Sequence, residues 1–118
     1  MLEYRTQFWN KNTSLPEEEA KKGNYYIVEI DSEERMVKYS YYNQENLESY
    51  VKYRYRRLGT TEITERVFFD NKDTFQGKQV VRESPGVEEL VEIYDMNGDL
   101  INLLRGTFEY IIKKGEIA

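Results

Sequence analysis

Apolar and polar side chains alternate with a period of two along most of the chain after residue 23, which is the pattern of half-buried β-strands. The alternating stretches are rich in β-branched and aromatic residues, and short polar stretches separate them. In chain order they are NYYIVEI, RMVKYSYY, ESYVKYRYRRL, TEITERVFFD, KQVVRES, VEIY and DLINL. The pattern predicts a mainly β protein of the α+β class, with an antiparallel, twisted meander sheet of about seven or eight strands.

The first two stretches predict a β-hairpin. The polar sequence DSEE, Asp31 to Glu34, lies between them and would form a four-residue loop. This loop would place Val28 opposite Val37. It would also place Tyr26 opposite Tyr39, so that four apolar side chains share one face and fix the register.

A second hairpin is predicted around Gly59. In the register that we favour, Tyr55 lies opposite Ile63, and Val51 lies opposite Val67. The same register places Arg56 opposite Glu62 on the other face.

The sequence SYVKYRYRR, residues 49–57, interleaves three tyrosines with four basic residues. Such a pattern suits either a stacking platform for single-stranded nucleic acid or an ordinary strand. As a strand it has an inner face of Val51, Tyr53 and Tyr55 and an outer face of Lys52, Arg54 and Arg56. We favour the ordinary strand, because Glu62 and Glu65 on the neighbouring strand would offset part of the positive charge.

Glu65 is the candidate buried carboxylate, because it falls between Ile63 and Val67 on the predicted inner face. A buried carboxylate can have a raised pKa and act as an acid. The structural alternative, which we favour, is a hydrogen bond to Tyr53 or an ion pair at the sheet edge.

Residues 14–23, SLPEEEAKKG, predict one short N-terminal helix. Ser14 would cap it, and Pro16 suits its first turn. Glutamates near its start and lysines near its end match the helix dipole. Gly23 fits a left-handed exit.

The C-terminal part contains a turn signal and an ambiguous segment. Asn97-Gly98 is a strong hairpin signal. Residues 99–114 have apolar residues at helical spacing, but Gly106-Thr107 would fall inside the helix. We favour strand there, because an interior glycine costs a helix about 1 kcal/mol.

The composition excludes several kinds of site. The chain has no cysteine and no histidine, so it lacks thiolate chemistry, the usual general base and the commonest metal ligand. Asp95, Asn97 and Asp99 alternate as in a calcium loop, but Leu100 and Gly106 occupy the positions where an EF-hand needs glycine and glutamate. We therefore expect no metal site and no cofactor.

The length of 118 residues predicts a single domain, residues 1–118. The N-terminal sequence MLEYRTQFWN lacks the pattern of a secretory signal. No apolar stretch approaches the roughly 18 residues that span a bilayer. We therefore expect a cytoplasmic protein.

The sequence YDMNGDL, Tyr94 to Leu100, resembles one unit of the tyrosine-aspartate (YD, or Rhs-type) hairpin repeats of bacterial proteins. More broadly, the chain resembles small bacterial β-meander proteins, some of which are suspected immunity partners of toxins. The resemblance implies a β-hairpin fold and carries no catalytic residues.

These features predict a non-enzymatic interaction domain that uses a sheet face rich in tyrosine and arginine, with an immunity-like protein as one concrete form. The alternative is a small-ligand binder or a carboxylate-dependent hydrolase with its site in a curved sheet. We expect a protein partner, no nucleic acid and no membrane, and a monomer or weak homodimer, in keeping with the net charge of −5. The candidate binding residues are Tyr42, Tyr50, Lys52, Arg54 and Arg56.

Overall fold

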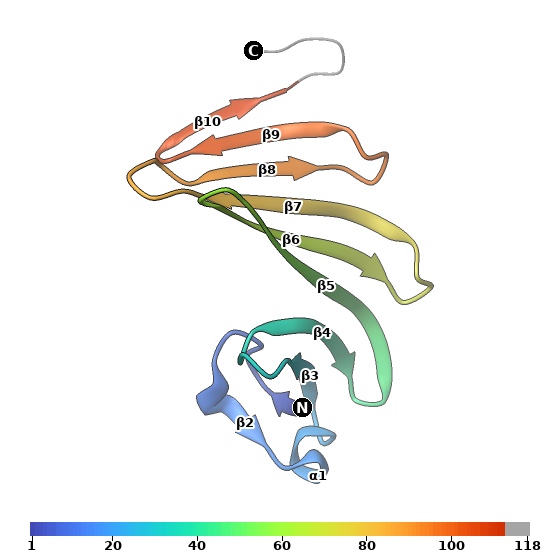
Figure 1. Ribbon diagram of the computed structural model, residues 1–118. Helices are drawn as coiled ribbons and strands as arrows, with labels where there is room; N and C mark the ends of the chain where they lie inside the picture. Colours follow the sequence, from blue (N-terminus) through green and yellow to red (C-terminus); the bar gives the residue numbers. More distant parts are fainter. Residues whose placement is uncertain (113–118) are drawn as a thin grey trace. The chain divides into compact units, whose positions relative to one another are not determined.

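A computed structural model describes residues 1–112 and shows one antiparallel meander sheet (Figure 1). The sheet order is β10-β9-β8-β7-β6-β5-β4-β3-β1-β2, so that all strands from β3 onward follow the chain order. The strands are β1 (Leu2–Arg5), β2 (Ser14–Leu15), β3 (Asn24–Ile30), β4 (Met36–Asn43), β5 (Asn46–Leu58), β6 (Thr61–Asp70), β7 (Phe75–Glu83), β8 (Leu90–Tyr94), β9 (Leu100–Arg105) and β10 (Phe108–Ile111). The predicted mainly β meander is confirmed, but the sheet has ten strands within residues 1–112 rather than seven or eight.

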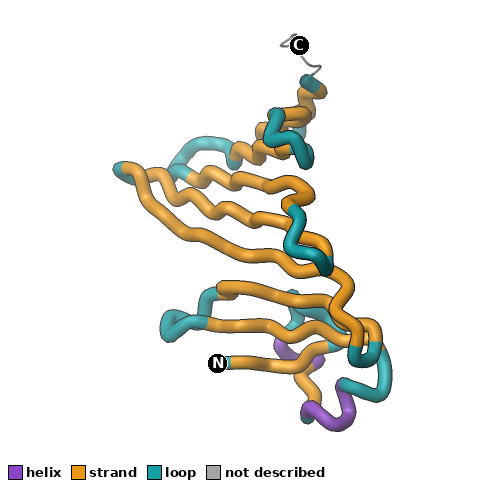
Figure 2. Tube along the Cα trace, turned by 90° about the vertical axis from the view of Figure 1, so that its right-hand side faces the viewer, coloured by secondary structure: helices purple, strands orange, loops and turns teal. Residues whose placement is uncertain are grey.

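Helical segments are confined to the N-terminal part of the described chain (Figure 2). They are the 3-10 turn η1 (Lys11–Thr13) and the helix α1 (Glu17–Ala20), which is shorter than predicted. Ser14 does not cap α1, because it belongs to β2 and its hydroxyl donates to the Lys11 carbonyl at 2.8 Å. Pro16 is the N-cap residue and supplies no side-chain hydrogen bond. The predicted left-handed exit at Gly23 is also wrong, since Gly23 is not among the residues with positive φ.

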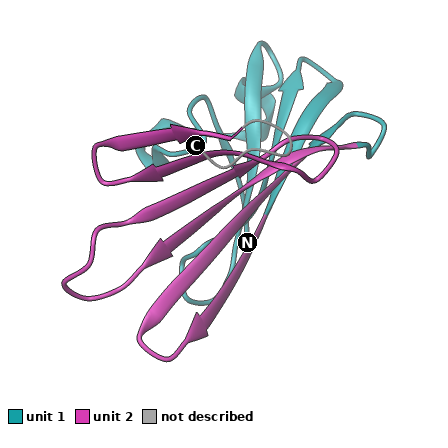
Figure 3. Ribbon diagram, turned by 90° about the horizontal axis from the view of Figure 1, so that it is seen from above, with its two compact units in different colours: residues 1–52, 69–74 teal, residues 53–68, 75–118 magenta. Residues whose placement is uncertain are grey.

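The contacts divide the chain into two compact units (Figure 3). Unit 1 comprises Met1–Lys52 and Phe69–Thr74, and unit 2 comprises Tyr53–Phe68 and Phe75–Ala118. Each unit has buried apolar side chains of its own. The single domain stays a prediction from the chain length.

Unit 1 is held together by aromatic side chains on both faces of its strands. On one face, Phe8 stacks on the buried Tyr39 with ring centroids 3.9 Å apart. The buried Arg5 guanidinium donates to the Phe8 carbonyl at 2.6 Å, so the segment that carries Phe8 is fixed over this face. Tyr25 is also buried, and its ring stacks on that of Tyr42 at 5.3 Å.

Strands β3 and β4 form the first predicted hairpin, but their register differs from the prediction. Val28 pairs with Tyr39 rather than Val37, and Tyr26 likewise pairs two residues further along β4. The loop, residues 31–35, is one residue longer than predicted. A bulge next to Ile30 adds the second residue of the shift.

Three hairpin turns share one hydrogen-bond pattern, in which an aspartate begins the turn. In the first, Oδ1 of Asp31 accepts from the N–H groups of Glu33 and Arg35, both at 2.9 Å. Asp70 and Asp95 accept from the residues two and four positions on, at 2.8 to 3.0 Å. The residue three positions after each aspartate has positive φ: Glu34 (62°), Asp73 (64°) and Gly98 (82°).

The turn between β5 and β6 shows why the second predicted register is wrong. β5 ends at Leu58 and β6 begins at Thr61, so Gly59 and Thr60 form the turn. The predicted register leaves Gly59 alone in it, but the tightest common hairpin needs two residues. Gly59 has a φ of 60°, as such a turn requires.

Side-chain contacts within unit 2 agree with a shift of one residue. The Arg66 guanidinium lies 5.6 Å from the Tyr53 ring centroid, and Arg57, not Arg56, makes the ion pair with Glu62. A one-residue shift turns each side chain of β6 to the opposite face. Tyr55 is therefore not opposite Ile63.

The C-terminal segment is strand, as predicted, over its described part. β9 and β10 pair from Asn102 with Ile111 to Arg105 with Phe108. Gly106, with a φ of 58°, forms the turn where a helix would have been interrupted. Residues 113 and 114 of the predicted segment lie outside the described residues.

Candidate functional site

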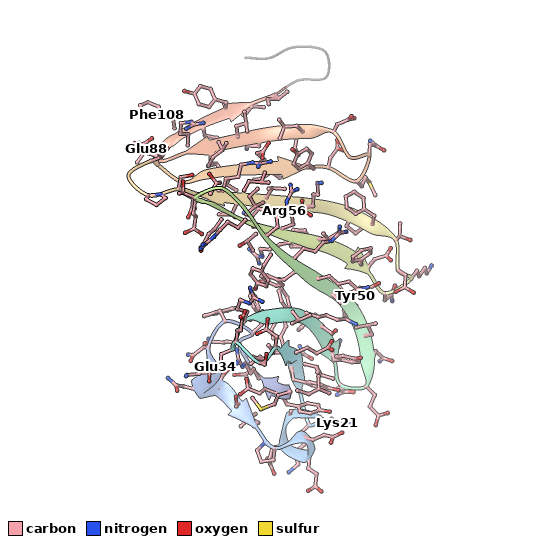
Figure 4. The ribbon with its side chains drawn as sticks, viewed as in Figure 1. Lys21, Glu34, Tyr50, Arg56, Glu88 and Phe108 are labelled. Carbon is pink, nitrogen blue, oxygen red and sulfur yellow. The ribbon has the colours of Figure 1, made fainter. Side chains whose placement is uncertain are left out.

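The basic candidate residues Lys52, Arg54 and Arg56 of β5 are exposed. Lys52 belongs to unit 1, and Arg54 and Arg56 belong to unit 2. Figure 4 labels Arg56 on this strand, where its guanidinium lies 3.8 Å from the carboxylate of Glu65. Arg57 pairs with Glu62. Two of the strand's arginines therefore have acidic neighbours, and their charges are partly offset.

The two candidate tyrosines of unit 1 are held by neighbouring groups. Tyr42 is half-buried and stacks on Tyr25. Tyr50 is buried; its ring stacks on Phe69 at 4.9 Å, and its hydroxyl donates to Asp73 at 2.5 Å (Figure 4). The hydrogen bond to Asp73, followed by burial, raises the pKa of Tyr50 to about 12. Tyr50 therefore acts first as a packing residue.

Two lysines of unit 1 lie beside the Tyr50 ring. Lys38 and Lys52 are directly paired across β4 and β5. Their ammonium groups lie 4.8 Å and 5.9 Å from the ring centroid. Each lysine can thus make a cation–π contact with the Tyr50 ring. The attraction of the ring for both ammonium groups offsets part of the repulsion between them.

Glu65 is mostly buried, with 15% of its side chain exposed, and it makes an ion pair with Arg56. The pair joins two interior strands, β5 and β6, and does not lie at the sheet edge where the sequence placed it. A second carboxylate, Glu92, accepts from Arg82 at 2.7 Å and from the Tyr94 hydroxyl at 3.1 Å. Burial and then this hydrogen bond raise the pKa of Tyr94. Each carboxylate therefore has a basic residue beside it.

A groove of about 650 Å³ opens on unit 2, on a different set of residues. Its apolar lining includes Phe68 of β6, Ile93 of β8 and Met96 of the turn that follows β8. Its polar lining includes Arg66, whose Nη1 donates to Oε1 of Gln79 at 2.9 Å. Glu65 does not line it.

Sequence reasoning missed the groove, because its lining comes from β6, β7, β8 and β9. One signal was available, the glycine within the strand sequence FQGKQVV. Gly77 has a φ of 134°, and a Cβ there would lie 2.6 Å from the Tyr94 carbonyl oxygen. An interior glycine in a strand often marks such a close approach of two backbones.

Within residues 1–112, no group of three or more acidic side chains is arranged to hold a metal ion. No helix in this part of the chain has the length and apolar character needed to cross a membrane.

Comparison with protein-family models, with curated proteins and with solved structures finds no significant match to this chain.

Proposed function

We propose that the protein is a non-enzymatic interaction domain that binds another protein through exposed side chains of its sheet. The observation that carries this proposal is the apolar surface of β10. Phe108 and Tyr110 lie on one face of β10 and are 64% and 44% exposed, and Ile111 on the other face is 64% exposed. Figure 4 labels Phe108 at the start of this strand. Large exposed apolar side chains that lie together mark interaction sites more often than isolated ones do.

The position of β10 adds a second reason. Within the described residues, β10 pairs only with β9 and is the last strand of the sheet. An extended segment of a partner can add to such an edge by backbone hydrogen bonds, with side-chain pockets supplying specificity. Protein recognition by strand addition therefore fits this edge.

The basic residues Arg54 and Arg56 are the second proposed contact surface. Both are exposed, and arginine is enriched among the residues that dominate binding energy. Because Glu62 and Glu65 lie beside the arginines of this strand, the surface suits a protein with mixed charges better than a polyanion. An immunity partner of a toxin is one concrete form of such a domain.

The alternative, a hydrolase centred on Glu65, has weaker support. Its carboxylate lies beside Arg56 and lines neither the groove nor the smaller hollow near Pro85. The geometry therefore favours the interaction domain.

The test compares partner capture by the wild-type chain and by a Phe108→Ser/Tyr110→Ser variant. We expect the wild type to retain a specific protein from the native lysate, quantified by mass spectrometry, and the variant to lose it. Val37→Ser is the matched control, because Val37 is an exposed apolar strand residue of unit 1. Equal capture by the wild type and the β10 variant would remove β10 from the binding surface.

A further inference from the structure

The groove of unit 2 has the size and the construction of a small-ligand site. Its volume of about 650 Å³ lies within the usual range for such sites, roughly 300 to 1,000 Å³. Gly77 lines it at the point where β7 approaches the backbone of β8. Because any side chain at Gly77 would collide with the Tyr94 carbonyl, this part of the lining is bare backbone.

Apolar side chains supply most of the remaining lining. Phe68, Ile93 and Ile101 come from three different strands. Met96 lies in the turn between β8 and β9 and is 56% exposed. Methionine is flexible and polarisable, so it can adapt to the shape of an apolar ligand. The lining therefore favours a ligand with an apolar body.

The charges of the lining favour an anion. Arg66 and Lys78 are its cations, and Asp95 is its acid. One oxygen of Asp95 already accepts the N–H groups of Asn97 and Asp99, at 2.9 Å and 3.0 Å. The lining thus carries a net positive charge, although the whole chain carries −5.

Arg66 is the group best placed to recognise that anion. Its guanidinium lies over the rings of Tyr53 and Phe68, at 5.6 Å and 5.7 Å from their centroids, and it donates to the Gln79 amide oxygen. These contacts hold the guanidinium plane in place. A guanidinium fixed in this way suits a carboxylate, because it keeps its positive charge and presents a planar group that matches the carboxylate.

We propose that the groove binds a small amphipathic carboxylate, with the carboxylate at Arg66 and the apolar body against Phe68, Ile93 and Met96. This site is separate from the β10 surface of the interaction domain. A failure of ligand binding in the groove therefore does not count against protein binding at β10, and the reverse also holds.

The experiment is a titration of the full chain, followed by amide NMR spectra, with phenylbutyrate and with its uncharged amide, phenylbutyramide. We expect saturable shifts at Gly77, Gln79 and Met96, with a millimolar or tighter dissociation constant for the carboxylate. The amide should bind about tenfold more weakly, because a hydrogen-bonded charge contributes about that factor.

Two variants test the role of Arg66. Arg66→Met should bind the two ligands equally, because it keeps an apolar stem and loses the charge. Arg105→Met is the matched control and should keep the preference for the carboxylate, because Arg105 is exposed on β9 and does not line the groove. If Arg66→Met does not fold, Arg66→Lys replaces it and should show a reduced preference.

Three outcomes would overturn the proposal. The first is the absence of saturable shifts in the groove at millimolar phenylbutyrate. The second is equal affinity of the wild type for the two ligands. The third is a preference for the carboxylate that Arg66→Met keeps.

Discussion

Tyr50 shows how a single residue can look like a binding residue in the sequence and yet serve the fold. It lies in the basic stretch of β5, but its ring is buried against Phe69 and its hydroxyl is bonded to Asp73. Lys38 and Lys52 flank the same ring. Tyr50 therefore contacts two cations and one carboxylate of unit 1.

The raised pKa of Tyr50 predicts a loss of stability at high pH. In the unfolded chain its hydroxyl ionises near pH 10, whereas in the folded chain its pKa is about 12. The folded state keeps the proton that the unfolded state has lost, so the stabilisation is complete below pH 10 and falls between pH 10 and 12. Urea melts over this range should show a steeper fall for the wild type than for Tyr50→Phe.

Asp73→Asn provides the second variant for this prediction. An amide still accepts the hydrogen bond but removes the negative charge, so the tyrosinate absorbance of Tyr50 should appear at lower pH than in the wild type. Identical titrations for the wild type and Asp73→Asn would contradict the assigned cause of the shift.

The recurring element of this fold is the aspartate-initiated hairpin turn at Asp31, Asp70 and Asp95. In each, one carboxylate oxygen binds two backbone N–H groups. The N–H of Arg35 is the first cause that lowers the pKa of Asp31, and the N–H of Thr74 is the first for Asp70. The turns at Asp31 and Asp70 therefore weaken as the pH falls through these lowered pKa values.

Replacing the aspartate of such a turn should destabilise the protein. Asp31→Ala leaves two N–H groups without their acceptor, and comparable losses at helix caps cost about 0.5 to 2 kcal/mol. Ser32→Ala changes the same exposed turn and should alter the free energy of unfolding by less than about 0.5 kcal/mol. Urea melts of the two variants measure the difference. Equal losses would mean that the carboxylate does not stabilise the turn.

The alternating pattern predicted which segments are strands, but it did not predict all of their registers. One face of β5 carries tyrosines and the other carries basic residues. An error of one residue in the register between β5 and β6 therefore places no charged side chain where an apolar one is required, and the pattern does not reveal the error. β1 was missed because it is short and its buried residue is the charged Arg5. Turn positions with positive φ were hidden too, because Glu34 and Asp73 occupy them without being glycine.

The sequence also predicted the candidate sites to different extents. Alternation within one strand places Lys52, Arg54 and Arg56 on one face, and the structure shows all three exposed, but alternation alone does not say which face is covered. The groove could not, because it depends on which strands are neighbours and on a bulge between β8 and β9. Gly77 indicated a close approach, but the sequence did not say to which strand.

At the scale of the whole molecule, nucleic-acid binding depends on the net charge and on where the charged side chains lie. The chain carries −5, and two of the arginines of SYVKYRYRR have glutamates beside them. A polyanion gains affinity by replacing its counterions with protein cations, and a neighbouring carboxylate reduces that gain. The arrangement thus opposes nucleic-acid binding at the one stretch whose composition suggests it.

We therefore expect single-stranded oligonucleotides to bind only non-specifically, with dissociation constants of roughly 10⁻⁴ to 10⁻⁶ M at physiological salt. Glu62→Gln/Glu65→Gln should bind more tightly and with a steeper salt dependence, because it frees the cations of β5. Glu18→Gln/Glu45→Gln is the matched control: it changes the net charge equally, from −5 to −3, but at exposed positions of unit 1. Fluorescence anisotropy at several salt concentrations measures the affinities. Equal gains in the two variants would show that net charge alone governs binding, and a salt-resistant, submicromolar affinity of the wild type would make SYVKYRYRR a nucleic-acid platform.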